Sequence, residues 1–193
     1  NIFDINRLGI DDSFEEGKSL TMGIDFKKSN ILDINKFFEA KLAAVYRENN
    51  ENFVPTSSGI DKKNSNVFGS VSSNLSEFLN VGYDFVIDND LNTLKYNSLN
   101  TTLNYKNLST EFTFIEENAE FGDANTLSNK TKLKFSDESY LTFNSRRNRK
   151  INLTEYYDLI YEYKKDCLVA GIKYNKTYYE DRDLKPSENL LFT

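Results

Sequence analysis

Residues 166–193 read DCLVAGIKYNKTYYEDRDLKPSENLLFT, and this stretch decides the fold class that we predict for the chain. Apolar and mixed positions alternate from Cys167 to Asn175, which is the two-residue period of a β-strand with one apolar face. A charged run at 180–183 and Pro186 follow, and residues 189–193 then resume an apolar strand pattern. The stretch therefore predicts a strand, a polar reversal and the start of a second strand.

The same two-residue period recurs along the rest of the chain. It predicts further strands over residues 20–26, 37–47, 67–71, 79–87, 92–106, 111–115, 130–135, 141–144 and 157–163, about eleven in all with the final hairpin. A helix is the alternative for 37–47, because Ala, Leu, Glu and Lys are good helix formers, but the neighbouring pattern favours a strand. Residues 74–77 and 136–139 predict short turns, whereas 48–66 and 116–125 predict long polar loops.

Composition narrows the range of functions. The chain has 193 residues, no His and one Cys, so it lacks the commonest general base and cannot form an internal disulfide or a Cys-based zinc site. A net charge of −6 argues against nucleic acid as a partner. With no Ser- or Cys-centred triad available, we expect no enzymatic activity, no cofactor and no metal site.

The pattern predicts an all-β antiparallel meander that forms the C-terminal part of a transmembrane outer-membrane β-barrel. Several expected strands are about ten residues long, the length that a tilted membrane crossing needs. The side opposite the apolar residues is heavily charged, which suits a watery interior. A soluble β-sandwich and a generic porin-like barrel are the alternatives, because short alternating strands also build them. Since the chain starts at Asn1 and stops within an apparent strand at Thr193, we expect residues 1–193 to be a fragment of one barrel domain.

Three stretches carry a resemblance to a known family. They are residues 1–26 (NIFDINRLGIDDSFEEGKSLTMGIDF), residues 58–66 (SGIDKKNSN) and residues 166–186 (DCLVAGIKYNKTYYEDRDLKP). In their order along the chain they resemble the C-terminal barrel of the LPS-assembly proteins of the outer membrane, the LptD (OstA/Imp) family. Residues 74–88 (NLSEFLNVGYDFVID) and the paired strands up to Glu117 fit the same order. The family's N-terminal periplasmic jelly-roll and first barrel strands have no counterpart in the chain.

The resemblance implies a transport function without chemistry of its own. Proteins of this family deliver lipopolysaccharide to the outer leaflet of the cell outer membrane in Gram-negative bacteria. The partners that it implies are lipopolysaccharide, outer-membrane lipid, an LptE-like plug lipoprotein and a periplasmic LptA-like bridge, the last reached through the missing N-terminal domain.

The resemblance also implies roles at the end of the chain. Cys167 is similar to a family cysteine that forms a disulfide with the N-terminal domain, although many members have two adjacent cysteines and here Leu168 follows; the alternative is a free, packed thiol. The strand that contains Asn189, Leu190, Leu191 and Phe192 would pair with the barrel's first strand at a lateral seam through which lipid leaves.

Charged clusters give further candidate sites, each with a plainer interpretation. Four basic residues are expected to face the lumen: Lys130, Lys132, Lys134 and Arg146. They either guide anionic lipopolysaccharide or simply form part of a hydrated inner wall. Arg147, Arg149 and Lys150 invite the same two interpretations. The acidic clusters at 11–16 and 181–183 suit a cation less well than solvated loops, because no oxygen-ligand spacing is met.

The period also assigns side chains to two faces. We expect these residues to face lipid: Leu20, Met22, Ile24, Phe26, Leu133, Phe135, Leu159 and Ile172. We expect these residues to face the lumen: Asp25, Lys132, Lys134, Asp158 and Lys173.

Overall fold

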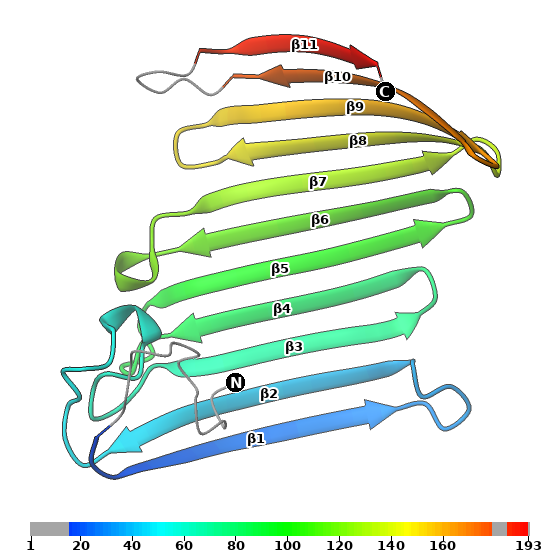
Figure 1. The fold of residues 1–193 in the computed structure, drawn as a ribbon. Coiled ribbons are helices and arrows are strands. Elements are labelled where there is room, and N and C mark those ends of the chain that lie inside the picture. The colour runs from blue at the N-terminus through cyan, green and yellow to red at the C-terminus, as the bar shows by residue number, and fades with distance from the viewer. Residues whose placement is uncertain (1–15, 179–184, 193) are drawn as a thin grey trace. The chain divides into compact units, whose positions relative to one another are not determined.

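Eleven strands form one antiparallel sheet in chain order, from β1 to β11 (Figure 1). The structure is a computed structural model that describes residues 16–178 and 185–192. The strands are β1 (Ser19–Ser29), β2 (Phe37–Arg47), β3 (Val67–Ser76), β4 (Leu79–Ile87), β5 (Leu94–Tyr105), β6 (Leu108–Glu117), β7 (Asn125–Lys134), β8 (Ser139–Asn148), β9 (Leu153–Lys165), β10 (Leu168–Thr177) and β11 (Ser187–Phe192). Two short 3-10 helices, η1 (Thr56–Ser58) and η2 (Ala119–Phe121), lie in the connections.

The predicted strand count and the all-β antiparallel meander are confirmed, and closure into a transmembrane barrel stays a prediction. Residues 37–47 form β2 rather than a helix. The predicted turn at 74–77 is wrong, because β3 continues to Ser76 and the chain reverses at 77–78. Asn74 pairs with Phe37 of β2, so backbone pairing extends the strand through residues whose polar side chains suggested a turn.

The two-residue connections all lie at one end of the meander. In an antiparallel meander, alternate connections lie at the same end of the strands. One end carries the connections 30–36, 77–78, 106–107, 135–138 and 166–167, three of which are two-residue turns. The other end carries 48–66, 88–93, 118–124, 149–152 and 178–186. The first end is called the short end because three of its five connections have two residues, although 30–36 has seven; the other end, where every connection has four residues or more, is called the long end.

The chain forms two compact units. The first contains the described residues up to Leu75, together with Gly82–Ser98 and Glu116–Asp123. The second contains Ser76–Val81, Leu99–Ile115 and the described residues from Ala124 onward.

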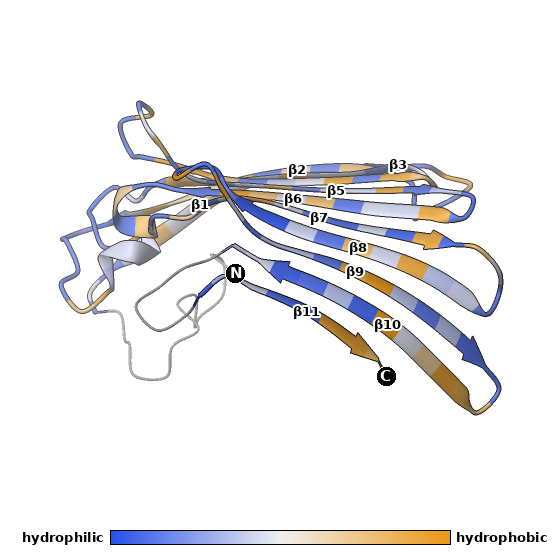
Figure 2. Ribbon diagram, turned by 90° about the horizontal axis from the view of Figure 1, so that it is seen from above, coloured by the Kyte–Doolittle hydropathy of each residue, from blue (hydrophilic) through white to orange (hydrophobic). Residues whose placement is uncertain are grey.

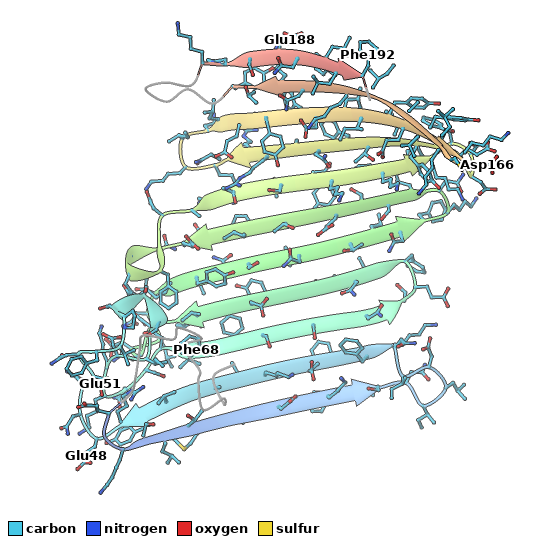
Figure 3. All side chains as sticks on the ribbon, in the orientation of Figure 1. Glu48, Glu51, Phe68, Asp166, Glu188 and Phe192 are labelled. Carbon is cyan, nitrogen blue, oxygen red and sulfur yellow. The ribbon has the colours of Figure 1, made fainter. Side chains whose placement is uncertain are left out.

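In the first unit, the long connection 48–66 packs against one face of β2 and β3. Val45 of β2 and Val54 and Ile60 of the connection form a buried cluster, and Phe68 of β3 packs against it (Figure 3). The Nε of Arg47, which is 2% exposed, donates to the backbone oxygen of Ile60 at 2.7 Å. The sequence predicted a polar loop and missed this small core, because two isolated apolar residues carry no period.

The β3–β4 pair places an aromatic ring over a glycine, and this contact gives a testable prediction. A Cβ built on Gly69 would lie 2.1 Å from Cζ of Phe85, closer than real Cβ atoms approach. We expect Gly69→Ala to lower the free energy of unfolding by about 1–3 kcal/mol, because the rigid ring must move. Gly82→Ala is the matched control, since nothing lies within 4 Å of the added carbon.

Urea titrations of both variants measure the difference. The double variant Gly69→Ala with Phe85→Leu is expected to recover part of the Gly69→Ala loss, because leucine is smaller and more adaptable than phenylalanine. An equal decrease in the free energy of unfolding for Gly69→Ala and Gly82→Ala would show that the contact with the Phe85 ring does not determine the cost of the substitution.

Candidate functional site

The candidate site is the pair of faces that the sheet presents in each unit. In the first unit, the residues paired between β1 and β2 share a face with their partner, and alternate residues along each strand lie on opposite faces. The Asp25 face contains Asp25, Lys27, Glu39 and Lys41. The Ile24 face contains Leu20, Met22, Ile24, Phe26, Ala40, Leu42, Ala44 and Tyr46.

The charges of the Asp25 face pair across the two strands. Glu39 accepts ion pairs from Lys41 at 3.1 Å and from Lys27 at 3.7 Å, and Lys41 also lies 3.7 Å from Asp25. The four side chains therefore alternate in sign along a ladder. Such a ladder suits a face that meets water, because partly exposed ion pairs keep most of their hydration.

The Ile24 face presents large apolar side chains that are exposed within the described residues. Ile24 is 72% exposed, and Leu20, Met22 and Phe26 are each more than half exposed. Figure 2 shows how hydrophobic and hydrophilic residues alternate along the strands. The predicted division of these residues into two faces is confirmed, and contact of the apolar face with lipid stays a prediction.

In the second unit, the three predicted lysines share one face. Lys130, Lys132 and Lys134 of β7 pair with Asn144, Thr142 and Tyr140 of β8, respectively, and this surface is called the Lys130 face below. The Nζ of Lys132 lies 4.2 Å from the centre of the Tyr140 ring, a cation–π contact. A cavity of about 400 Å³ opens beside Lys130. Its lining includes Glu111, Thr113, Ser128, Asn144 and Tyr156.

The Lys130 face continues across β8, β9 and β10 as a polar surface. Asp158 lies opposite Asn144 on one side and Asn175 on the other. The Asn175 Nδ2 donates to Asp158 at 2.5 Å, and Lys173 forms an ion pair with the same carboxylate at 3.4 Å. Arg146 lies on this face and its Nε is 2.9 Å from a carboxylate oxygen of Glu155. Arg146 is therefore a paired residue, and its lumenal position stays a prediction.

The opposite surface of the second unit, called the Leu159 face, is apolar. Phe143 of β8 pairs with Leu159, which pairs with Tyr174 of β10, and Ile172 pairs with Phe192 of β11. Leu190 of β11 pairs with Tyr174 and lies on the same face. Several large side chains of this face are exposed, namely Phe143, Leu159, Ile172, Leu190 and Phe192. Leu133 is half-buried and Phe135 is 57% exposed, so neither lies in the closed core that a β-sandwich would require. Within the described residues the strands form one sheet, not two packed ones.

The basic run at 146–150 divides between the two faces. Arg147 pairs with Leu127 of β7, so it lies on the Leu159 face. Arg149 follows β8 and lies 5.1 Å from the ring of Phe114. Phe114 lies on the Leu159 face, because it is four residues along β6 from Thr110, which hydrogen-bonds to Thr131 on that face. The expectation that all these residues share one environment with Arg146 is wrong, because a strand side chain reverses direction at each residue.

Two candidates lie near the end of the chain. Cys167 is an exposed free thiol in the two-residue turn 166–167, at the short end of the meander. Figure 3 labels Asp166, the first residue of this turn. Asn189, Leu190 and Leu191 belong to β11, which pairs with β10 through the register Lys173 to Leu191. Pro186 directly precedes this strand, as predicted. The family roles of both stay predictions.

Other candidates lie partly outside the described ranges. Residues 11–15 and 181–183 of the acidic clusters are not described, and the amide of Glu16 donates to Glu51 at 2.9 Å. In residues 16–178 and 185–192, no group of three or more His, Cys, Asp and Glu side chains is arranged to hold a metal ion. Across the same described ranges, no helix has the length and apolarity of a membrane span.

Among the carboxylates in the connections, Asp88 and Asp137 have lowered pKa values. Asp88 accepts the backbone amides of Asn92 at 2.8 Å and Thr93 at 3.2 Å, and these hydrogen bonds hold its pKa below the ordinary value. The hydrogen bond and charge of Lys134 lower the pKa of Asp137. Their stabilising effect is therefore present above the ordinary carboxyl pKa and is lost as the pH falls through the lowered one.

No protein-family model matches the chain, and no curated protein matches it. Among solved structures, a triple-substitution mutant of the Rh. blastica porin resembles it with a TM-score of 0.46 and 11% sequence identity. The alignment covers 89% of this chain and 78% of the porin chain.

Proposed function

We propose that the chain forms part of the wall of an outer-membrane β-barrel. The observation that carries this proposal is the contrast between faces in each unit: exposed apolar side chains on one face and cross-strand ion pairs on the other. An apolar face this exposed is unfavourable in water, because monomeric soluble proteins rarely leave wide apolar patches uncovered. In a bilayer the same face is stabilised by lipid, and the charged face meets an aqueous interior.

Strand length and direction support a barrel wall. Ten of the eleven strands have nine or more residues, close to the roughly 9–11 residues of a tilted membrane-crossing strand. In an antiparallel meander of eleven strands, β1 and β11 run in the same direction. A barrel that stays antiparallel throughout therefore needs an odd number of further strands between β11 and β1. These strands would also cover the edges that β1 and β11 otherwise present.

Within that class, we assign the chain to lipopolysaccharide delivery. The support is the resemblance of residues 1–26, 58–66 and 166–186 to the LPS-assembly family, and the place of Cys167 at the short end. Outer-membrane barrels keep their short turns on the periplasmic side. In that orientation Cys167 would lie in the periplasm, a compartment that permits the disulfide with an N-terminal domain. An LptE-like lipoprotein and an LptA-like bridge are the corresponding partners.

A diffusion pore is the second candidate, and the long connection 48–66 favours it. This connection packs over Val45 and Phe68, which lie on the charged side of β2 and β3 with Lys41. A segment held against the inner wall narrows the channel, which suits passage of small solutes more than a bulky glycolipid.

Depletion of the protein in its host distinguishes the two candidates. For lipopolysaccharide delivery we expect new lipopolysaccharide to fail to reach the cell surface, as measured by surface labelling. For a pore we expect normal surface lipopolysaccharide and slower uptake of small hydrophilic solutes. Normal lipopolysaccharide delivery after full depletion would overturn the first assignment.

A Cys167→Ser variant tests the periplasmic role of the thiol. We expect altered migration in non-reducing electrophoresis of protein from its native membrane, because the proposed disulfide is lost. A variant that migrates like the parent and delivers lipopolysaccharide normally would show that Cys167 is only a free thiol.

A further inference from the structure

The basic residues on the apolar Leu159 face lie at the long end of the meander. Arg147 is the second-last residue of β8, and Arg149 and Lys150 begin the connection 149–152. Arg147 and Arg149 are both exposed. Two guanidinium groups thus lie where an apolar wall meets its rim, while Arg146 lies on the opposite face with Glu155.

Both arginines are held by neutral partners. The Nη2 of Arg147 donates to Oδ1 of Asn152, and the guanidinium of Arg149 lies over the Phe114 ring at 5.1 Å. These contacts orient the side chains without neutralising their charge. A guanidinium fixed against a ring or an amide keeps further N–H groups for a second acceptor, and its planar fork matches a phosphate.

The turn that carries the cluster is ordered by its own side chains. The Oδ1 of Asn148 accepts the backbone amides of Lys150 at 3.1 Å and Ile151 at 3.4 Å. Ile151 is 63% exposed and Leu127, the partner of Arg147, is 40% exposed. Charged and apolar groups therefore adjoin at the rim, as the headgroup and acyl chains of a lipid do.

We propose that Arg147 and Arg149 bind the phosphate of an anionic lipid in the outer leaflet, with Leu127 and Phe114 against its acyl chains. The proposal rests on the proposed function, because the barrel orientation places the long end outside. It adds a lipid site on the outer wall, separate from any transport path through the Lys130 face. Long basic side chains at a membrane boundary reach the headgroup level while their stems stay apolar.

Native mass spectrometry of the detergent-solubilised protein tests the site with lipid A as the probe. The test variant is Arg147→Gln with Arg149→Gln. The matched control is Lys164→Gln with Lys165→Gln, which removes the same charge from exposed residues of β9 at the short end. Dephosphorylated lipid A separates phosphate recognition from acyl-chain binding. Inorganic phosphate as competitor separates a lipid site from a general anion site.

We expect the test variant to bind lipid A about tenfold or more weakly, because charge-assisted hydrogen bonds are lost. The control should bind like the parent, and dephosphorylated lipid A should bind parent and test variant alike. The Arg147→Lys with Arg149→Lys variant should recover part of the affinity, which shows that the glutamine variant lost charge rather than fold.

Three results would overturn the inference. They are unchanged binding in the test variant, an equal loss in the control, and displacement of lipid A by inorganic phosphate at equal concentration. None of these results affects the proposal that the apolar face of the sheet contacts lipid. That proposal is tested separately by measuring the accessibility of single labelled residues to lipid and to water. An equal loss in the control would indicate a response to total charge, and displacement by phosphate would indicate an anion site without lipid specificity.

Discussion

Replacing Ile24 with arginine is expected to prevent stable insertion of the protein into a bilayer. Ile24 is the central residue of β1, it is 72% exposed, and it pairs with Leu42, the central residue of β2. In the proposed barrel both lie near the middle of the hydrocarbon layer. An arginine on the lipid face at that depth costs about 2–4 kcal/mol, a large part of the stability of a folded domain.

Ser70→Arg is the control for this substitution. Ser70 of β3 pairs with Lys41 on the charged side of the strands, so the new guanidinium would meet water and the carboxylates of that face. Folding into vesicles, followed by electrophoresis without heating, separates folded from unfolded protein. Equal folding yields for Ile24→Arg and Ser70→Arg would contradict the assignment of the two faces.

Replacing Ile60 with alanine is expected to release the connection 48–66 while the strands stay paired. Ile60 is 4% exposed and packs with Val45 and Val54 in a cluster too small to absorb the loss. Truncation of a buried isoleucine costs about 2–5 kcal/mol. Here we expect it to lower the free energy needed to open the connection locally, and not the stability of the strands.

Hydrogen exchange measures this opening directly. The amide of Asn66, which donates to the oxygen of Gly59 at 2.9 Å, should exchange faster in Ile60→Ala, while amides paired between β1 and β2 stay protected. Ile31→Ala is the control, because Ile31 is fully exposed in the connection 30–36, and we expect its effect within about 0.5 kcal/mol. Equal exchange in both variants would show that the small core does not hold the connection. If the chain lines a pore, the released connection should also raise solute flux.

The sequence predicted the strands and the division of their faces, because the two-residue period of apolar and polar side chains can be recognised without knowing any long-range contact. Leu20, Met22, Ile24 and Phe26 alternate with polar neighbours, and a one-residue slip would expose the wrong face, so their register is strongly specified. The β3–β4 turn was placed too early because Asn74 and Ser76 resemble turn residues, although pairing with β2 keeps the strand extended.

Features that depend on contacts distant in sequence were not predicted. The core of Val45, Val54 and Ile60 joins a strand to a connection whose apolar residues follow no period. From the sequence, Arg146, Arg147 and Arg149 form a single basic group, because a run of charged residues does not itself show which way each side chain points. The register between β7 and β8 separates them.

Accessibility of single spin-labelled residues tests the central claim most directly. In a Cys167→Ser background, cysteines placed one at a time from Met22 to Lys27 and from Ala170 to Asn175 would be spin-labelled in the bilayer-embedded protein. We predict collisions with oxygen, which concentrates in lipid, at Met22, Ile24, Phe26 and Ile172, and collisions with a water-soluble nickel complex at Asp25, Lys27 and Lys173. Nickel accessibility at all these residues, or an alternation of opposite phase, would contradict a barrel wall with lipid on its apolar face.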